Sequence, residues 1–127
     1  MSTLSPEERI LAKFEENMRK NEAALSALNR HKKSLEEKED AVCDSQRQLN
    51  DYLETHRDLY AGTEEGPVFY RFDEALHEEE TKIGKLLAAE KEELAEEEKQ
   101  LYAEQEEYQK QRRAELSAYY EKGAEEA

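Results

Sequence analysis

The sequence contains no Trp, one Cys, two Pro and four Gly among its 127 residues, and aromatic residues make up only 8% of it. A single cysteine, Cys43, cannot form a disulfide within the chain, so we expect a buried or indifferent thiol, with a redox role as the alternative. The few prolines and glycines leave long stretches in which nothing interrupts a helix. Because 41% of the residues are charged and 36% hydrophobic, a thick globular core is excluded.

The sequence also lacks any run of 18 or more apolar residues, which predicts that the chain does not insert into a membrane. Residues 1–6 show neither the basic nor the apolar region of a signal peptide, so a cytoplasmic protein is favoured, and export together with a partner is left open. The net charge of -14 offers no basic face for phosphate. Nucleic acids and anionic lipid surfaces are therefore excluded as partners.

What the sequence does contain is helix signals. Ser5 is suited to cap a helix that begins at Pro6, with Glu8 three residues after the cap, and no breaker follows until Gly62. Pro67 suits the start of a second helix. We predict an all-α single domain over residues 1–127, with helices over about 5–60 and 67–122, a turn over 61–67 and a short acidic tail over 123–127.

Heptad spacing of apolar residues predicts how these helices pair. The first helix carries two rows, one of Phe14, Asn21, Leu28, Leu35, Val42 and Leu49, and a companion of Leu11, Met18, Leu25, Lys32, Glu39, Gln46 and Leu53. The second carries Leu87, Leu94, Leu101 and Tyr108, preceded by Phe69, Leu76 and Ile83 and followed by Leu116 and Tyr119.

Antiparallel pairing of these rows gives residue numbers that sum to about 129, as for Leu28 with Leu101 and Val42 with Leu87. Half of 129 is 64.5, which falls within residues 62–67; this segment contains Gly62, Gly66 and Pro67, and we call it the Gly/Pro cluster. A long antiparallel two-helix hairpin, resembling a coiled coil, follows. Lys32 opposite Glu97 and Glu39 beside Lys91 are predicted to specify this alignment. A continuous helix that dimerises is the alternative, and it leaves the Gly/Pro cluster unexplained.

Such a hairpin has about one good apolar layer per heptad, so we expect marginal stability for the isolated chain. Apolar residues beside the seam are predicted to bind a partner helix, against the alternative of a solvated flank. The predicted partner-binding residues are Ile10, Tyr52, Leu59, Phe69, Tyr70, Leu86, Ala88, Ala95 and Tyr102.

Signatures of catalysis are weak. Glu74-x-x-His77 has the spacing of a helical ligand pair for a carboxylate-bridged metal site, but such sites need a second copy on a facing helix. No HExxH, CxxC, phosphate-binding glycine loop or nucleophile elbow is present. We therefore predict no enzyme, no metal site and no cofactor.

Two segments carry a resemblance to a known family: residues 68–76 (VFYRFDEAL), at the aromatic start of the second helix, and the run KLLAAEKEEL at 85–94. In pattern, most of the chain resembles the small helical partner proteins of LXG toxins in the type VIIb secretion system, which are similar to WXG-type hairpins. It departs from WXG proteins in lacking Trp at the turn. The resemblance implies that the chain binds the helical domain of a toxin, with a second small helical protein as a further partner.

The expected function is that of a non-enzymatic targeting chaperone or adaptor, which makes an LXG-type toxin competent for type VII secretion. Two alternatives stay open. One is a self-associating structural coiled coil, which predicts a homo-oligomer of the chain alone. The other is a coiled-coil stalk component of an export ATPase.

Overall fold

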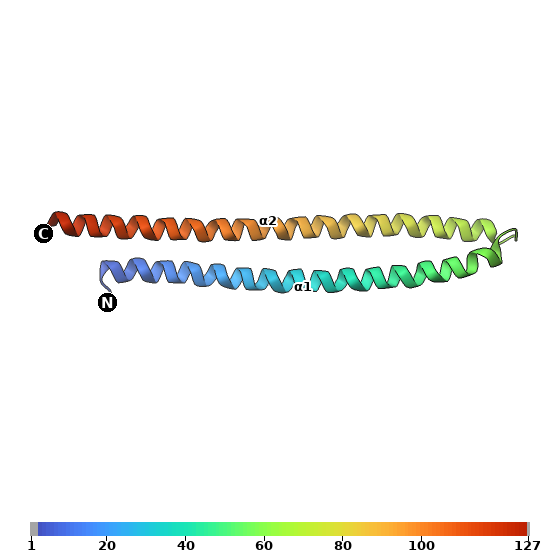
Figure 1. Ribbon diagram of the computed structural model, residues 1–127, viewed down its shortest axis with the longest axis horizontal. Coiled ribbons are helices and arrows are strands. Elements are labelled where there is room, and N and C mark those ends of the chain that lie inside the picture. The colour runs from blue at the N-terminus through green and yellow to red at the C-terminus, as the bar shows by residue number, and fades with distance from the viewer. Residues whose placement is uncertain (1–2, 127) are drawn as a thin grey trace. The chain divides into compact units, whose positions relative to one another are not determined.

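The computed structural model describes residues 3–126, and every regular element in them is helical. Helix α1 spans Pro6–Tyr60 and helix α2 spans Gly66–Glu126, joined by a short turn (Figure 1). The fold is an all-α helical hairpin, as predicted. The helices are long because neither contains an interior proline after its first turn, and their charged residues favour helix on solvent-facing positions.

The ends of α1 follow the predicted signals. The hydroxyl of Ser5 accepts a hydrogen bond from the backbone N–H of Glu8 at 3.2 Å, which caps the first turn. At the other end, Gly62 has φ of 77°, a left-handed conformation that glycine adopts without strain. The Thr63 hydroxyl and backbone N–H both donate to the carbonyl of Tyr60, at 2.7 and 3.1 Å. These bonds give the last carbonyl of α1 its hydrogen-bond partners and hold the turn in which the chain reverses direction.

Helix α2 differs from the prediction at both ends. It begins at Gly66, one residue earlier than expected, and it continues through Gly123 to Glu126, where an acidic tail was predicted. A glycine costs only about 1 kcal/mol in a helix, so Gly123 followed by helix-favouring Ala and Glu does not end it. The last residue of the predicted tail, Ala127, lies outside the described residues.

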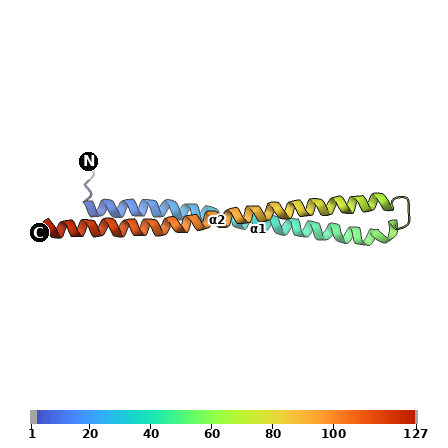
Figure 2. The ribbon, with the colours of Figure 1, turned by 90° about the horizontal axis from the view of Figure 1, so that it is seen from above.

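Residue contacts divide the hairpin into two units, each containing a segment of both helices. We call Met1–Arg30 with Leu94–Ala127 the terminal unit, and His31–Glu93, which includes the turn, the turn unit. Within each unit the two helical segments run antiparallel and lie side by side (Figures 1 and 2).

In the terminal unit, the seam between the helices is fixed by polar contacts as well as by leucines. Asn21 is only 3% exposed, and its Nδ2 donates to the carbonyl oxygen of Leu101 at 2.8 Å. The Arg112 guanidinium lies over the Phe14 ring, 4.4 Å from its centroid. The Tyr120 hydroxyl donates to the Glu7 carboxylate, which joins the two ends of the chain. These contacts confirm antiparallel pairing in this unit, but not the predicted sum of about 129. Asn21 was predicted to lie opposite Tyr108 and instead bonds to Leu101, and the contacts of Phe14 with Arg112 and of Glu7 with Tyr120 give sums of 126 and 127.

In the turn unit, the Tyr60 and Phe69 rings stack with centroids 5.4 Å apart and fulfil the predicted sum of 129. Farther from the turn, Lys91 and Glu39 form the predicted ion pair. The seam positions of α2 also include carboxylates that an apolar pattern does not reveal, since Asp73 and Glu80 are half-buried. The seam of this unit is thus a mixed apolar and acidic surface.

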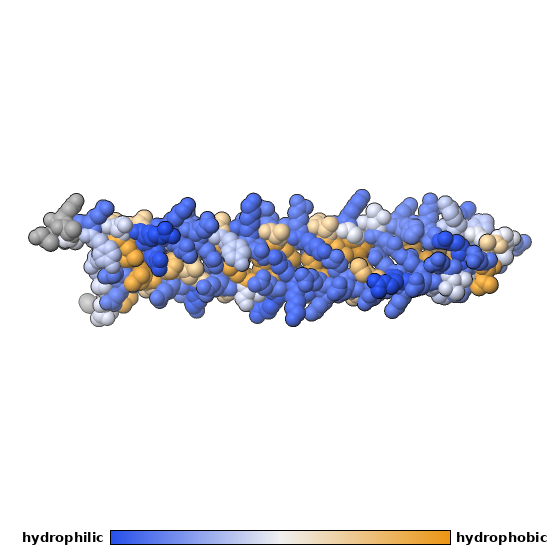
Figure 3. Space-filling view, viewed as in Figure 1, coloured by the Kyte–Doolittle hydropathy of each residue, from blue (hydrophilic) through white to orange (hydrophobic). Residues whose placement is uncertain are grey.

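Every residue of the predicted seam rows is buried or half-buried. Full burial is nevertheless rare. Among the described residues the buried apolar side chains are Leu28, Leu35, Leu53 and Leu94, each 2 to 4% exposed. Two helices cover each other on one face only, so most seam residues keep contact with solvent. In Figure 3 the apolar residues accordingly appear as interrupted patches between charged rims.

Candidate interaction surface

Large apolar side chains project into solvent at several places, and they are concentrated in the turn unit. Seven lie there: Tyr52, Leu59, Tyr60, Val68, Tyr70, Phe72 and Leu86, with exposed fractions from 36% to 70%. The terminal unit contributes Leu4, Tyr102 and Tyr120. Single exposed apolar residues are ordinary, but a group of this size on one segment is a candidate interaction surface.

The predicted partner-binding residues differ in how far they reach solvent. Five are more than half exposed: Tyr52, Leu59, Tyr70, Leu86 and Tyr102. Ala88 and Ala95 are exposed as well, whereas Ile10 and Phe69 are half-buried. Phe69 belongs to the seam through its stacking on Tyr60.

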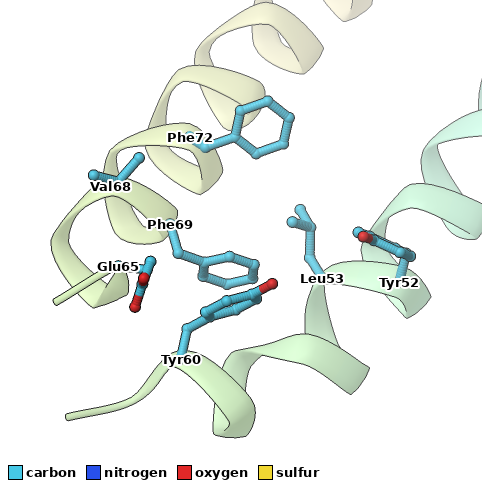
Figure 4. Close-up of a pocket in the computed structure, with 7 residues that line it drawn as sticks. All are labelled: Tyr52, Leu53, Tyr60, Glu65, Val68, Phe69 and Phe72. Carbon is cyan, nitrogen blue, oxygen red and sulfur yellow. The ribbon is translucent and has the colours of Figure 1, made fainter. Parts of the chain in front are cut away.

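The structure brings two of these residues together in a hollow beside the turn, with a volume of about 410 Å³. Tyr52 comes from α1 and Phe69 from α2, and the remaining walls are Leu53, Tyr60, Glu65, Val68 and Phe72 (Figure 4). In the figure, the Phe72 ring and the Leu53 side chain lie on either side of the opening above the stacked Tyr60 and Phe69 rings. The walls are aromatic and aliphatic except for Glu65. The hollow can therefore receive an apolar side chain from another molecule.

Sequence reasoning missed Tyr60 and Phe72 as members of this site. Tyr60 follows the buried Leu53 by seven residues, so it continues a seam row to the end of α1. Phe72 precedes Leu86 by two heptads and shares its face of α2. Heptad spacing alone could have predicted that these two residues belong to the site.

Two further hollows show that the predicted residues do not form one stripe. One, of about 340 Å³, includes Ala41, Ser45 and Glu79; the other, of about 270 Å³, includes Cys43, Gly84 and Ala88. Both share the seam residues Val42, Gln46, Glu80 and Ile83, so they lie on opposite flanks of the seam.

Heptad spacing assigns the other predicted residues of the turn unit to these flanks. Tyr52 and Leu59 follow Ser45 at steps of seven, and Leu86 follows Glu79, which places all three on the flank of Ser45 and Glu79. Tyr70 precedes Gly84 by two heptads and lies on the flank of Ala88. In the terminal unit, Ala95 and Tyr102 share one face of α2, and Ile10 lies on α1.

The titrating groups with perturbed pKa values lie in the terminal unit, which contributes no residue to the aromatic hollow. Hydrogen bonds from Arg19, at 2.8 to 3.2 Å, lower the pKa of Glu16. The hydrogen bond to Glu7 raises the pKa of Tyr120. Both are surface pairs that join neighbouring helical turns or the two helices, and Glu7 and Tyr120 also border an open hollow of about 610 Å³.

Metal binding and membrane insertion find no support in the described residues. Between residues 3 and 126, no three His, Cys, Asp or Glu side chains are grouped so as to hold an ion. His77 of the Glu74-x-x-His77 pattern instead lies 3.4 Å from Glu80, on the exposed surface. Neither helix, as far as it is described, is apolar enough over a sufficient length to cross a membrane. No known protein family, characterised protein or solved structure matches the chain.

Proposed function

We propose that this protein acts by binding and not by catalysis, as an adaptor or targeting chaperone that covers apolar surface on a helical partner. The observation that carries the proposal is the group of seven exposed large apolar side chains in the turn unit. Full burial of a fully exposed large apolar side chain contributes about 1.5 to 3 kcal/mol, and these seven residues are 36% to 70% exposed. A partner that covers four or five of them gains on the order of 4 to 9 kcal/mol. This gain is comparable with the lower half of the entropy cost of association, about 4 to 15 kcal/mol, so half-buried seam residues must contribute as well.

The thin core supports the same role. With only four buried leucines, each 2 to 4% exposed, in the described part of the chain, the hairpin leaves its seam accessible from both flanks. A third helix laid along such a flank buries half-exposed residues of both α1 and α2 together. Partner binding therefore adds stability that the isolated hairpin lacks.

We further propose that the partner is the helical N-terminal domain of an LXG-type toxin, and that the complex is the form competent for type VII secretion. Support comes from the aromatic start of α2, residues 68–76, on which the family resemblance was based. This segment contributes Val68, Phe69 and Phe72 to the aromatic hollow. The residues that carry the resemblance thus also line the strongest candidate docking site.

The test is co-expression of the tagged chain with the helical domain of an LXG toxin, followed by affinity capture at low and at moderate salt. We expect a stoichiometric complex that survives both conditions, because apolar burial is not screened by salt. Failure to copurify under both conditions would contradict the toxin assignment.

A pair of variants separates docking from general surface charge. Leu59→Ser combined with Tyr70→Ser removes one large apolar side chain from each flank, at 66% and 67% exposure, and should abolish capture while the helical circular dichroism is retained. Glu92→Gln combined with Glu96→Gln is the matched control on exposed positions of α2 and should retain capture. Equal capture by both variants would show that the apolar residues are not the contact.

A further inference from the structure

Helix α1 carries a second heptad pattern on the Ser45 flank of the seam. Its positions follow at alternating steps of four and three residues, and all are exposed: Ala41, Ser45, Gln48, Tyr52, Thr55 and Leu59. None of these six residues is charged. In a chain of which 41% is charged, such a face is unusual.

Helix α2 presents a matching pattern on the same flank. The exposed positions are Val68, Phe72, Ala75, Glu79, Lys82 and Leu86, again at alternating steps of four and three. The two patterns meet where Tyr52 faces Val68 and Phe72 across the aromatic hollow, and again where Ala41 and Ser45 share a hollow with Glu79. We call these twelve residues the outer stripe.

The outer stripe has the spacing and side chains of a docking groove for one more helix. Steps of four and three are those by which a helix presents one face to a neighbour, and two adjacent helices with such faces form a groove. Tyr52 and Phe72 supply large anchors, and Ala41, Ser45 and Ala75 leave room for a helix to approach closely. The hollow of about 410 Å³ between the anchors is large enough for an aromatic or leucine side chain.

Charge decides which kind of helix fits. The turn unit carries 18 Asp and Glu against nine Lys and Arg. Within the stripe, Glu79 and Lys82 form an ion pair at 3.3 Å, and Glu65 borders the aromatic hollow, so the excess negative charge comes from the unit as a whole. A second copy of this chain would bring a surface of the same sign against it, which costs free energy. A helix with an apolar face and a lysine- and arginine-rich remainder is attracted instead.

We propose that the outer stripe binds a single cationic amphipathic helix, whose apolar face covers Tyr52 and Phe72 and whose basic residues are attracted by the net negative charge of the turn unit. The inference rests on the proposed role as an adaptor for helices, and not on the identity of the toxin. It assigns one flank of the turn unit, and one chemistry of partner, to that role.

Because the chain has no Trp, a peptide with one Trp reports its own binding. The probe is a synthetic peptide of about three heptads, with Leu at the a and d positions, one Trp at a central d position and Lys elsewhere. Added to the full-length protein, it should show a blue-shifted, saturable Trp emission. The affinity should decrease as salt is raised, because the attraction between charges is screened, but binding should persist at moderate salt, because apolar burial is not screened. The same peptide with Glu in place of Lys should not bind.

Two tyrosines of similar exposure provide the matched variants. Tyr52→Ser, at a position 57% exposed in the outer stripe, should weaken peptide binding about ten-fold, as expected for an aromatic anchor. Tyr102→Ser, at a position 53% exposed in the terminal unit, should leave binding within about two-fold of the wild type. Phe72→Ser serves as a second stripe variant, and circular dichroism verifies that each variant stays helical.

Three results would overturn the inference: no binding of the Lys peptide, equal binding of the Glu peptide, or equal loss in Tyr52→Ser and Tyr102→Ser. Sedimentation of the protein alone as a dimer that Phe72→Ser dissociates would also overturn it, since the stripe would then bind a second copy. The adaptor function and the binding of a cationic helix to the outer stripe can be refuted independently. If the toxin domain is captured equally well by Tyr52→Ser, the inference falls and the function stands, whereas peptide binding without toxin capture leaves only the inference.

Discussion

Replacement of the buried Asn21 by leucine is expected to stabilise the protein, although most substitutions at buried positions destabilise. Asn21 is 3% exposed, and its Oδ1 is buried with no hydrogen-bond partner among the described residues. The substitution loses the bond from Nδ2 to the Leu101 carbonyl, which contributes about 1 kcal/mol. It also removes the unsatisfied oxygen, which costs about 1 to 3 kcal/mol.

Leucine at this position adds roughly 2 kcal/mol of apolar burial, from which overpacking of the larger side chain subtracts about 1 kcal/mol or more. The net expectation for Asn21→Leu is an increase of about 1 to 2 kcal/mol in the free energy of unfolding, read from urea denaturation followed by circular dichroism. Asn21→Ala, which removes the amide without the added burial, is the control and should gain less.

The same substitution should loosen the specificity of pairing. A buried Asn that donates to one carbonyl favours the alignment in which that carbonyl is present, and leucine has no such preference. Sedimentation is therefore expected to show more self-association for Asn21→Leu than for the wild type. A loss of more than about 1 kcal/mol in Asn21→Leu would refute the reasoning, because the hydrogen bond would then outweigh the unsatisfied oxygen and the added burial together.

Three further substitutions test the hairpin. Leu53→Ala, at a position 2% exposed, should lower the free energy of unfolding by about 2 to 4 kcal/mol in urea denaturation. Gly62→Ala forces a side chain into the left-handed conformation and should lower the free energy of unfolding by about 1 kcal/mol. At Gly84 an added Cβ meets nothing within 4 Å, so Gly84→Ala should raise the free energy of unfolding by about 0.5 to 1 kcal/mol. Melting temperatures of the two variants that move in the same direction would contradict this. Because the pKa of Tyr120 is raised, its bond to Glu7 stabilises the fold fully at pH values below the ordinary tyrosine pKa, and this stabilisation is lost as pH rises through the raised pKa. Glu7→Gln should therefore lower the pKa of Tyr120, measured from phenolate absorbance.

Local sequence rules were sufficient for the hairpin itself. Ser5, Gly62 and the heptad rows act through capping, left-handed backbone and helical periodicity, all of which depend on residues close in sequence. Gly123 did not stop α2, because a glycine ends a helix only where other contacts favour a turn. At Gly62 the Thr63 bonds to Tyr60 supply that preference.

The interaction surface was only partly predictable. Apolar residues outside the seam were identified correctly as exposed in most cases, but their division between two flanks depends on which helix faces which hollow. Tyr52 and Tyr70 are both tyrosines outside the predicted seam rows, yet they lie on opposite flanks of the seam. Half-buried carboxylates such as Glu80 were missed for another reason, since burial at a seam position is imposed by the neighbouring helix and not by the side chain's own polarity.

The stacked pair Tyr60 and Phe69 has a consequence for how the chain folds. The two rings are nine positions apart in sequence, whereas the Tyr120 to Glu7 bond joins residues 113 positions apart. Closing a short loop loses much less chain entropy than closing a long one, so the first native contacts form around the turn. Pairing of the helices then extends outward from the turn, and during synthesis all residues of the aromatic hollow are present before the α2 segment of the terminal unit has been made.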